Sequence, residues 1–553
     1  MNIIRGFPST SNNAFPLNTI TFLKAAARTF PEVGIVSREI SGAMWRYTYK
    51  EAFARIRRLA NALVKLGIGP GDRVGVLEWN THRYFELYYA VSGIGAVLLQ
   101  VNPRIGSADR AYVINHSEAV IVFVAENMLP LIESVEKDLA TVRGYVVLTE
   151  KPAAEVRTTL SPVHHYESLL AEQSETFDFP MIDENSAYSA CYTTGTTGKP
   201  KGVYYSHRCI YLHSLMQALM LGINVNDVVM QTVPMFHCHG WGMFFSATLA
   251  GAKLVFPGMY TAEKVYELVD IMIAEKVTVN GGAPAIFMPM LEYIKTLPEP
   301  PEFKGLRMIS GATEPSLALM KGFYDLGGAE ILHGYGATET TPLVTLNRLK
   351  PSLAGVSETE KWELRKKQGL PLTGVEVEIR DSDGRVMPHD GKSVGEILFR
   401  GPWITAAYYN DERTAESFVD GFWKSGDAGT IDENGYMKIT DRFKDIIKSG
   451  GEWISSIDLE NALMAHPAVL EATVAGVPHP KWEERPVALV VLRDNFRGKT
   501  NKEDILEFIA PRFAKWQLPD EILFVDEIPK TSVGKFSKKD VRAMFGDVYR
   551  KKG

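Results

Sequence analysis

The chain has 553 residues, which at roughly 150 residues per domain allows three or four folding units and excludes a single small binding module. Hydrophobic residues make up 45% and charged residues 23%, the balance of a globular protein with a large core, which excludes a disordered chain. Lys and Arg number 60 and Asp and Glu 66, so the net charge of −6 excludes a general binder of nucleic-acid backbones. Any anion must therefore bind at a local site.

Cysteine usage and hydropathy indicate the compartment. The three cysteines, Cys191, Cys209 and Cys238, are too few and too irregularly spaced for the disulfide framework of a small secreted protein. The N-terminus lacks the apolar run of a secretory signal, and the most apolar window, 87–99, is shorter than the roughly 20 residues that span a bilayer. We expect a cytoplasmic protein without a transmembrane segment, and peripheral membrane contact stays open.

Short β-rich runs alternate with amphipathic helical stretches in the first part of the chain. The runs lie at 73–77, 96–101, 119–124 and 145–148, and a helical pattern covers 49–66. Strands that are apolar along their whole length, separated by helices, are typical of a buried parallel sheet. The sequence therefore predicts an α/β fold built from βαβ units.

The pattern changes twice towards the C-terminus. Short strands with turn signals between 374 and 400 predict a β-rich subdomain. After Asp441 the composition becomes Lys-rich, and we expect a small α+β domain with the junction near 441–444, which gives domains 1–441 and 442–553. The elements predicted in this second domain are helix 457–465, strand 469–475, strand 486–492, helix 502–513 and strand 521–525.

The sharpest motif is Tyr192-Thr-Thr-Gly-Thr-Thr-Gly-Lys-Pro-Lys-Gly202, between strand-like runs at 187–192 and 203–206. Its glycines permit close backbone approach, its threonine hydroxyls can donate hydrogen bonds and its lysines add positive charge, which together suit a polyphosphate. It differs from a Walker A loop, because Pro200 follows Lys199 where that loop has Ser or Thr. The alternative is a glycine-rich hairpin turn, although a hairpin needs only about two such residues.

Four further segments agree with a known family, in its order along the chain. With the glycine-rich loop they make the sequence resemble the adenylate-forming (ANL) superfamily of acyl-CoA synthetases, adenylation domains and luciferases. Five ordered motifs are far more specific than one. The four segments are His333-Gly-Tyr-Gly-Ala-Thr-Glu-Thr-Thr341, Trp423-Lys-Ser-Gly-Asp427, Asp441-Arg-Phe-Lys-Asp445 and Pro529-Lys-Thr-Ser-Val-Gly-Lys535.

Two segments make medium- to long-chain fatty acyl-CoA synthetases the nearest subgroup: Val233-Pro-Met-Phe-His-Cys-His-Gly-Trp241 and Lys448-Ser-Gly-Gly-Glu-Trp-Ile-Ser-Ser456 resemble its acyl-pocket and gate segments. The resemblance implies a large domain of stacked α/β layers with a β-rich subdomain, and a small mobile C-terminal domain. It implies an AMP-forming acid–thiol ligase that converts a carboxylic acid and ATP into acyl-AMP and pyrophosphate, then transfers the acyl group to CoA. ATP, coenzyme A and Mg²⁺ are the implied cofactors, the partners are small molecules, and a homodimer is compatible.

The resemblance also assigns roles to residues. Lys535 would reach the carboxylate and α-phosphate, Thr193 and Glu339 would hold magnesium, and His237 would border the acyl pocket. Individually, Glu339 could be a residue at a helix start and Lys535 a solvated surface lysine. The ATP- and AMP-binding positions are Thr193, Thr194, Gly195, Thr196, Thr197, Gly198, Lys199, Gly311, Ala312, His333, Gly334, Tyr335, Gly336, Thr338, Asp427, Arg442 and Lys535.

The resemblance also gives candidate residues for the channel that holds the acyl chain and CoA. Separately, Lys444 matches the position of the family's hinge residue. Trp453 could be a swinging gate or a tryptophan packed permanently at the domain interface. The Met-rich stretch 281–290 could line a plastic tunnel or fill a core. Zinc at residues 237–239 is not expected, because the spacings of metal ligands separate them by at least two residues. The channel candidates are His237, Trp241, Gly282, Gly450, Gly451 and Trp453.

One segment departs from the family pattern. At 310–316 the chain has Thr313 and Glu314 before Pro315, which we expect to begin a helix. If Glu314 faces the acyl pocket instead, a polar or hydroxylated acid would fit better than a plain fatty acid. The functional alternatives are a ligase for short, hydroxy or aromatic acids, an enzyme that loads a carrier-protein thiol, a luciferase-like oxygenase and a noncatalytic adenylate sensor.

Overall fold

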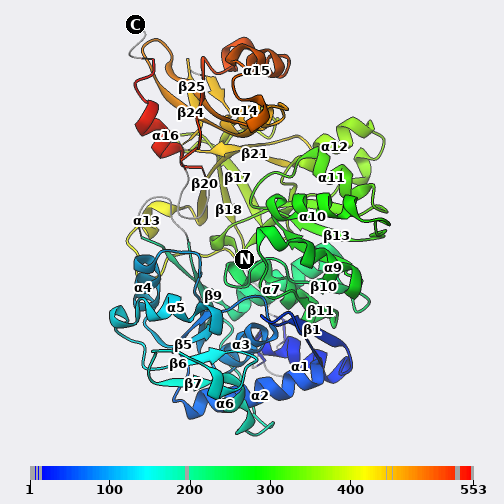
Figure 1. Ribbon diagram of the computed structural model, residues 1–553, viewed down its shortest axis with the longest axis vertical. Helices are drawn as coiled ribbons and strands as arrows, with labels where there is room; N and C mark the ends of the chain where they lie inside the picture. The colour runs from blue at the N-terminus through cyan, green and yellow to red at the C-terminus, as the bar shows by residue number, and fades with distance from the viewer. Residues whose placement is uncertain are drawn as a thin grey trace. The chain divides into compact units, whose positions relative to one another are not determined.

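The computed structural model describes residues 6–7, 10, 15–193, 199–443, 445–450, 452–529 and 536–549. The chain forms two compact units (Figure 1). Unit 1 contains residues 1–375 and 400–421, and unit 2 contains residues 376–399 and 422–553. The junction expected near 441–444 falls inside unit 2, and a hinge at that place stays a prediction.

Unit 1 contains a sheet in the strand order β7-β6-β5-β3-β4-β8-β9. Its strands pair in parallel except for β9, which is antiparallel to β8. The parallel sheet predicted from the alternating apolar runs is confirmed. The strands are β3 (Arg73–Leu77), β4 (Val97–Gln100), β5 (Ala119–Ala125), β6 (Tyr145–Leu148), β7 (Val163–His165), β8 (Ala187–Tyr192) and β9 (Gly202–Ser206).

A second sheet of unit 1 has the order β16-β15-β14-β13-β12-β10-β11-β1-β2. The strands from β14 to β1 are parallel, and β15, β16 and β2 add antiparallel edges. Helices α9 to α11 lie beside β10 to β13 (Figure 1) and share one apolar core with them. The strands are β1 (Gly34–Arg38), β2 (Met44–Thr48), β10 (Val228–Met230), β11 (Lys253–Phe256), β12 (Val279–Gly282), β13 (Arg307–Ser310), β14 (Glu330–Gly336), β15 (Leu343–Leu346) and β16 (Leu370–Pro371).

Helix α3 (His82–Gly93) connects the two sheets of unit 1. All its residues are buried, and it contacts β4 of the first sheet and β1 of the second, so it lies between them. Its Tyr88 ring lies 5.0 Å from Phe244 of α8 and 6.4 Å from Tyr188 of β8. The other helices of unit 1 are α1 (Ile20–Thr29), α2 (Tyr49–Lys65), α4 (Ser107–His116), α5 (Leu129–Glu133), α6 (Tyr166–Ala171), α7 (His207–Leu221), α8 (Met243–Ala250), α9 (Tyr266–Glu275), α10 (Pro284–Thr296), α11 (Leu317–Tyr324), α12 (Glu358–Lys366) and α13 (Thr414–Ser417).

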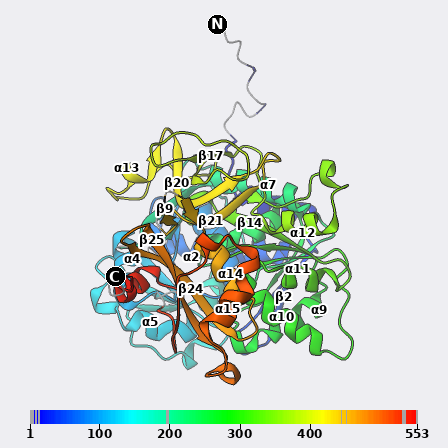
Figure 2. The same cartoon turned by 90° about the horizontal axis from the view of Figure 1, so that it is seen from above.

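Unit 2 contains two further sheets. Strands β17 (Glu376–Arg380), β18 (Gly395–Arg400), β20 (Phe422–Ile431) and β21 (Met437–Arg442) belong to one sheet, as expected for the β-rich segment, and β20 is antiparallel to both β18 and β21. Strands β24 and β25 pair over their full length, and Figure 2 shows α16 on one side of β24 and α14 and α15 on the other. The remaining elements are β22 (Ile447–Ser449), β23 (Glu452–Ile454), α14 (Ser456–Met464), β24 (Val469–His479), β25 (Glu483–Leu492), α15 (Lys502–Ile509), β26 (Glu521–Phe524) and α16 (Lys538–Phe545).

The core of unit 2 follows the period of a strand. Val474 and Val490 belong to the apolar cluster with α14 and α15, whereas Ala475 and Leu489 belong to the cluster with α16. Because successive side chains of a strand point to opposite faces, both faces of β24 and β25 are covered by helices. In both units, no helix of the described segments is long and apolar enough to cross a bilayer.

Candidate functional site

The glycine-rich motif connects two antiparallel strands, β8 and β9. At its base Thr193 N–H donates to the carbonyl of Lys201 (2.9 Å), and Lys201 N–H donates to Thr193 Oγ1 (3.3 Å). The loop is therefore a long hairpin connection whose ends are held together. The candidates Thr194, Gly195, Thr196, Thr197 and Gly198 lie outside the described residues.

The two lysines after the loop contact aromatic rings. Lys201 Nζ lies 4.2 Å from the centroid of the Tyr408 ring, and Lys199 Nζ lies 4.9 Å from that of Tyr112. Burial lowers the pKa of Lys201, and the Glu339 carboxylate partly opposes this shift. A half-buried cation beside the loop is suited to an anionic ligand.

Glu339 lies in a short 3₁₀ turn, Thr338–Thr340, that follows β14. Its side chain accepts a hydrogen bond from the hydroxyl of Tyr408 (2.6 Å), and its carbonyl accepts one from Thr405 N–H (2.8 Å). Tyr408 thus contacts both Glu339 and Lys201. Lys201 therefore links the two candidates: its backbone N–H donates to Thr193, and its ammonium lies against the ring of Tyr408, whose hydroxyl donates to Glu339.

Thr193 and Glu339 fit magnesium by their donor chemistry. A hydroxyl and a carboxylate are hard oxygen donors, and Mg²⁺ commonly takes one or two such protein ligands together with phosphate and water. Within the described ranges no three His, Cys, Asp or Glu side chains form a cluster that could hold a metal. Thr193 and Glu339 therefore suit a metal that arrives with a phosphate ligand.

The predicted adenine segments follow β13 and form the end of β14. His333 is buried, which lowers its pKa to about 4, and its Nδ1 donates to the carbonyl of Lys366 (2.5 Å). Tyr335 is half-buried, and its N–H donates to Thr345 Oγ1 (3.2 Å). A Cβ atom on Gly336 would lie 2.4 Å from the Pro342 carbonyl, so only glycine fits there.

The loop after β13 packs closely against the Trp241 indole. A Cβ atom on Gly311 would lie 3.1 Å from the Trp241 indole and 3.4 Å from the carbonyl of Gly334, so two nucleotide candidates and one acyl candidate lie together. Ala312 has a φ of 70°, an uncommon conformation for a residue with a side chain. Predicted nucleotide and acyl residues therefore meet where the loop after β13 passes β14.

The segment from Cys238 to Gly242 forms a left-handed turn. The φ angles are 45° at Cys238, 56° at His239, 57° at Gly240, 62° at Trp241 and 73° at Gly242. A left-handed conformation costs about 1 to 2 kcal/mol per residue that has a side chain, so the three residues other than glycine store strain. The half-buried His237 immediately precedes this turn.

Buried amide side chains hold the turn. Gln231 Nε2 donates to the carbonyls of Val233 and Gly240 (both 2.8 Å), and its Oε1 accepts from Phe244 N–H (3.2 Å). Gln217 Nε2 donates to the carbonyl of Trp241 (2.8 Å). The backbone of the turn therefore has partners even though it lies in the interior.

His239 is part of this buried network. Its Nε2 lies 2.6 Å from Ser189 Oγ, and its backbone N–H donates to Gln100 Oε1 (2.8 Å). Burial lowers the pKa of His239 to about 3, which keeps the ring neutral. The neighbouring Tyr205 hydroxyl donates to the carbonyl of Thr338 (2.7 Å), which links the turn to the segment that carries Glu339.

The described side chains of the Met-rich stretch pack in the core of unit 1. A Cβ atom on Gly282 would lie 2.9 Å from Phe287, so this glycine allows α10 to pack closely. Phe287 and Met290 belong to the core under the second sheet. Phe287 and Met290 therefore fill a core and do not line a tunnel. Among the acyl candidates, Trp241 is the large side chain that lies next to the adenine loop, at Gly311.

Unit 2 carries the remaining candidates. Arg442 forms an ion pair with Asp427 (3.0 Å) across β20 and β21, where the two residues are direct partners. Trp453 is half-buried in β23, with its ring 6.0 Å from that of Phe443, and Gly450 has a φ of 62° at the preceding turn. Lys444, Gly451 and Lys535 lie outside the described residues.

The expected helix start at Thr313 and Glu314 is wrong. Helix α11 begins at Leu317, and Ser316 Oγ caps it by accepting from Leu319 N–H (3.2 Å). Glu314 instead forms an ion pair with Lys366 (3.3 Å). Ser316 is also a preferred cap residue, and its hydroxyl is the one that binds an N–H of the first turn.

Three groups in the site were missed in the sequence: Tyr408, Tyr205 and Gln231. Tyr408 lies 69 residues from Glu339 along the chain, so no local motif contains both. The turn itself had a signal, because Gly240 and Gly242 flank Trp241 and glycine is the usual residue at positive φ.

The fold defines the class of the protein: a two-unit α/β protein whose larger unit contains two mostly parallel sheets. A family model described as "AMP-binding enzyme" matches residues 23–409, and one described as "AMP-binding enzyme C-terminal domain" matches residues 458–535. The chain belongs to this family of AMP-binding enzymes, and it is an AMP-forming acid–thiol ligase.

Two relatives and one solved structure illustrate the similarity. The long-chain-fatty-acid–CoA ligase of Thermus thermophilus is 42% identical, over 99% of this chain and 98% of that protein. The 3-methylmercaptopropionyl-CoA ligase of Ruegeria lacuscaerulensis is 38% identical, over 96% and 98%. The anthranilate CoA ligase AuaEII in complex with anthranoyl-AMP has the same fold, with a TM-score of 0.81 at 23% identity over 96% of this chain and 97% of that chain.

Proposed function

We propose that this protein is a fatty acyl-CoA ligase for medium- to long-chain acids. The observation that carries this proposal is the 42% identity with a long-chain-fatty-acid–CoA ligase over essentially the whole chain. The acid would react with ATP to give acyl-AMP and pyrophosphate, and the thiol of CoA would then displace AMP. Adenylation comes first because a carboxylate has no good leaving group, whereas acyl-AMP has one.

The first half-reaction would use the group around the hairpin loop. Negative charge gathers on the phosphates during adenylation, so fixed donors and cations dominate such a step. The loop 193–199 and Lys201 would hold the phosphates, and Thr193 and Glu339 would hold Mg²⁺. When bound, the metal neutralises phosphate charge. Tyr408 would keep the Glu339 carboxylate in place through its hydroxyl.

Other residues would position the nucleotide and the acid. Tyr335 would stack on adenine beside Gly311, and Asp427 would accept hydrogen bonds from the ribose with Arg442 near the phosphate. Lys535 would contact the carboxylate and the α-phosphate. His237 and Trp241 would border the acyl chain next to Gly311.

The second half-reaction needs a path for CoA. We assign it to Gly450, Gly451 and Trp453, with Lys444 as the hinge that moves the smaller domain between the two steps. Free cysteines support a reducing cytoplasm as the compartment. A homodimer is a further proposal, which analytical ultracentrifugation of the full chain would test.

The decisive experiment measures release of AMP with ATP, Mg²⁺ and CoA across a panel of carboxylic acids. We expect the largest kcat/KM for saturated acids of medium or long chain, and no AMP release without CoA beyond one turnover. A second candidate is a ligase for short acids, favoured by the 38% identity with a 3-methylmercaptopropionyl-CoA ligase and by the Trp241 indole against Gly311. A maximum at short acids would select it and reject the first proposal.

A further inference from the structure

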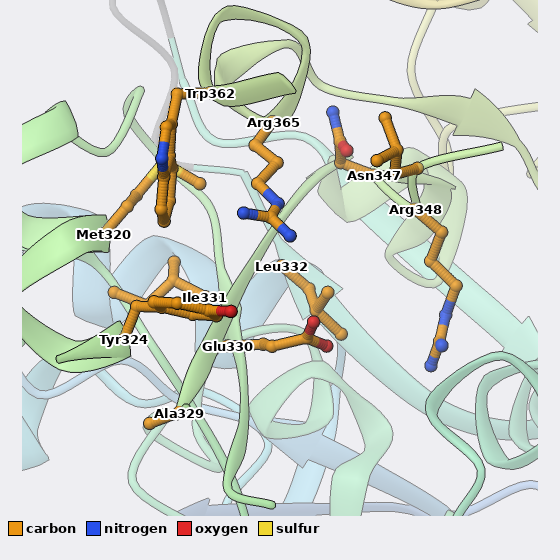
Figure 3. A pocket seen from close by; sticks show the side chains of 11 residues that line it. Met320, Tyr324, Ala329, Glu330, Ile331, Leu332, Asn347, Arg348, Trp362 and Arg365 are labelled. Atoms are coloured by element: carbon orange, nitrogen blue, oxygen red, sulfur yellow. The ribbon is translucent and has the colours of Figure 1, made fainter. Parts of the chain in front are cut away.

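Unit 1 contains a cavity of about 210 Å³ between α11, β14 and α12. Figure 3 shows Trp362 and Arg365 of α12 entering it from one side and Tyr324, Ile331 and Glu330 from the other. Ile331 belongs to the core, so the cavity has an apolar floor, and its walls are aromatic.

Arg365 places a positive charge in this cavity, against two aromatic rings. Its guanidinium carbon lies 4.6 Å from the centroid of the Trp362 ring and 5.7 Å from that of Tyr324, and the two rings are nearly perpendicular (86°). In the part of the chain that the structure describes, Arg365 forms no ion pair within 4 Å, although its charge, after that of Lys361, helps to lower the pKa of the exposed Glu358 in the same helix. A guanidinium that stacks through its face keeps its N–H edge available for a planar anion.

Charge and size narrow the ligand further. Arg348 and Arg365 both line the cavity, and Glu330 is the one acidic side chain in its lining. An apolar cavity of about 150 Å³ accommodates one benzene ring. A volume of about 210 Å³ therefore has room for one ring and a small anionic group. We propose that this cavity binds a small planar anion: a single aromatic ring that carries a carboxylate or a group of similar shape.

The cavity is connected to the nucleotide site through α12. Lys366, the residue after Arg365, forms an ion pair with Glu314 through its side chain (3.3 Å) and accepts a hydrogen bond from His333 Nδ1 through its carbonyl (2.5 Å). One residue thus holds both predicted adenine segments. Asn347, which also lines the cavity, donates to the carbonyls of Leu364 and Lys367 (2.7 and 2.8 Å).

A ligand held between Arg365 and Ile331 would restrain the last turn of α12 against β14, and with it both adenine segments. We therefore expect occupancy to lower the KM for ATP at least about fivefold, the lower end of ordinary coupling between two sites. This second effect rests on the proposed function, whereas binding of the ligand does not.

The test uses the full chain and 5-phenyltetrazolate, a planar aromatic anion that has no carboxylate and therefore cannot form an acyl adenylate. Isothermal titration calorimetry should give one site with Kd on the order of 1 mM, as expected for a ligand of this size. Arg365→Gln should raise Kd at least tenfold. Arg385→Gln, a change of an arginine with 75% of its side chain exposed in unit 2, is the matched control and should leave Kd unchanged.

His237→Ala separates this cavity from the proposed acyl pocket. Unchanged binding in His237→Ala together with weak binding in Arg365→Gln supports the proposal, and Trp362→Leu should weaken binding likewise if melting temperatures stay equal. Loss of binding in His237→Ala but not in Arg365→Gln would place the anion in the acyl pocket and overturn it. Absence of binding at 20 mM would also overturn it, even in an enzyme with full CoA-ligase activity.

Discussion

Replacing Gly240 with alanine tests whether the left-handed turn depends on its buried partners. The new Cβ atom would lie 2.2 Å from Gln231 Nε2 and 2.9 Å from the carbonyl of Val233. Gln231 would have to move, and its donors to the carbonyls of Val233 and Gly240 would be lost. The variant therefore combines backbone strain with the loss of two buried hydrogen bonds.

The magnitude follows from these two terms. Alanine in a left-handed conformation costs about 1 to 2 kcal/mol. The Gly240 carbonyl, which loses its Gln231 donor, adds about 1 to 3 kcal/mol, whereas the Val233 carbonyl keeps a second donor in Asn80 Nδ2 (3.0 Å). Gly222, the C-cap of α7, provides a matched control, because its φ of 63° is close to the 57° of Gly240. A Cβ atom there meets only the end of the Arg307 side chain, at 3.4 Å.

The assay is urea unfolding of both variants, followed by tryptophan fluorescence. We expect Gly240→Ala to lower the free energy of unfolding by at least about 2 kcal/mol more than Gly222→Ala, since only the former loses hydrogen bonds. The KM for the acid should also rise in Gly240→Ala, because the turn positions Trp241. Equal losses of stability in the two variants would refute the reasoning, since the strain term alone would then account for both.

Glu339→Gln should slow acyl-AMP formation by about 10² or more, measured as pyrophosphate release, whereas near-normal rates at saturating Mg²⁺ would remove Glu339 from the metal site. Lys535→Ala should impair adenylation but spare thioester formation from supplied acyl-AMP, and equal loss in both steps would contradict domain alternation. Trp453→Ala should raise the KM of long acids more than that of short acids if Trp453 is a gate; a uniform kinetic change with a large loss of melting temperature would show a packed residue instead. Burial holds the pKa of His213 and of His239 at about 3, below the roughly 6.5 of the unfolded chain, so stability should fall as the pH drops from 6.5 towards 3, by about 1.4 kcal/mol per pH unit for each. The difference between the urea midpoints at pH 7.5 and pH 5 should be smaller in His239→Gln than in the parent protein. An equal difference in the two proteins would show that His239 does not cause the loss of stability at low pH.

The central strands could be predicted because their chemistry is local. Runs 73–77 and 145–148 coincide with β3 and β6, since strands buried on both faces are apolar at every position. The helix expected at 49–66 is α2, which begins after Thr48 in a capping box with Glu51. Signals of this kind lie within one turn or one strand of the chain.

The start of α11 and the partners of the site were not predictable in the same way. Thr313 and Ser316 both satisfy the residue preference of a helix cap, and Pro315 suits the first turn of a helix that starts at either place. The sequence alone therefore does not select Ser316. Tyr408 looked like an ordinary aromatic residue, because its contact with Glu339 exists only after the chain has returned to β14. Such long-range pairs leave no pattern in a single sequence.

The left-handed turn shows why its polar partners are amides and not ions. Its carbonyls need donors and its N–H groups need acceptors, and an amide side chain provides both without burying a charge. Gln231 follows β10, Gln217 lies on α7 and Gln100 lies on β4, so partners from three elements converge on the five residues of the turn. The surrounding fold, more than the sequence of the turn, therefore fixes its shape. A backbone that is unfavourable by itself can in this way keep the indole of Trp241 against Gly311.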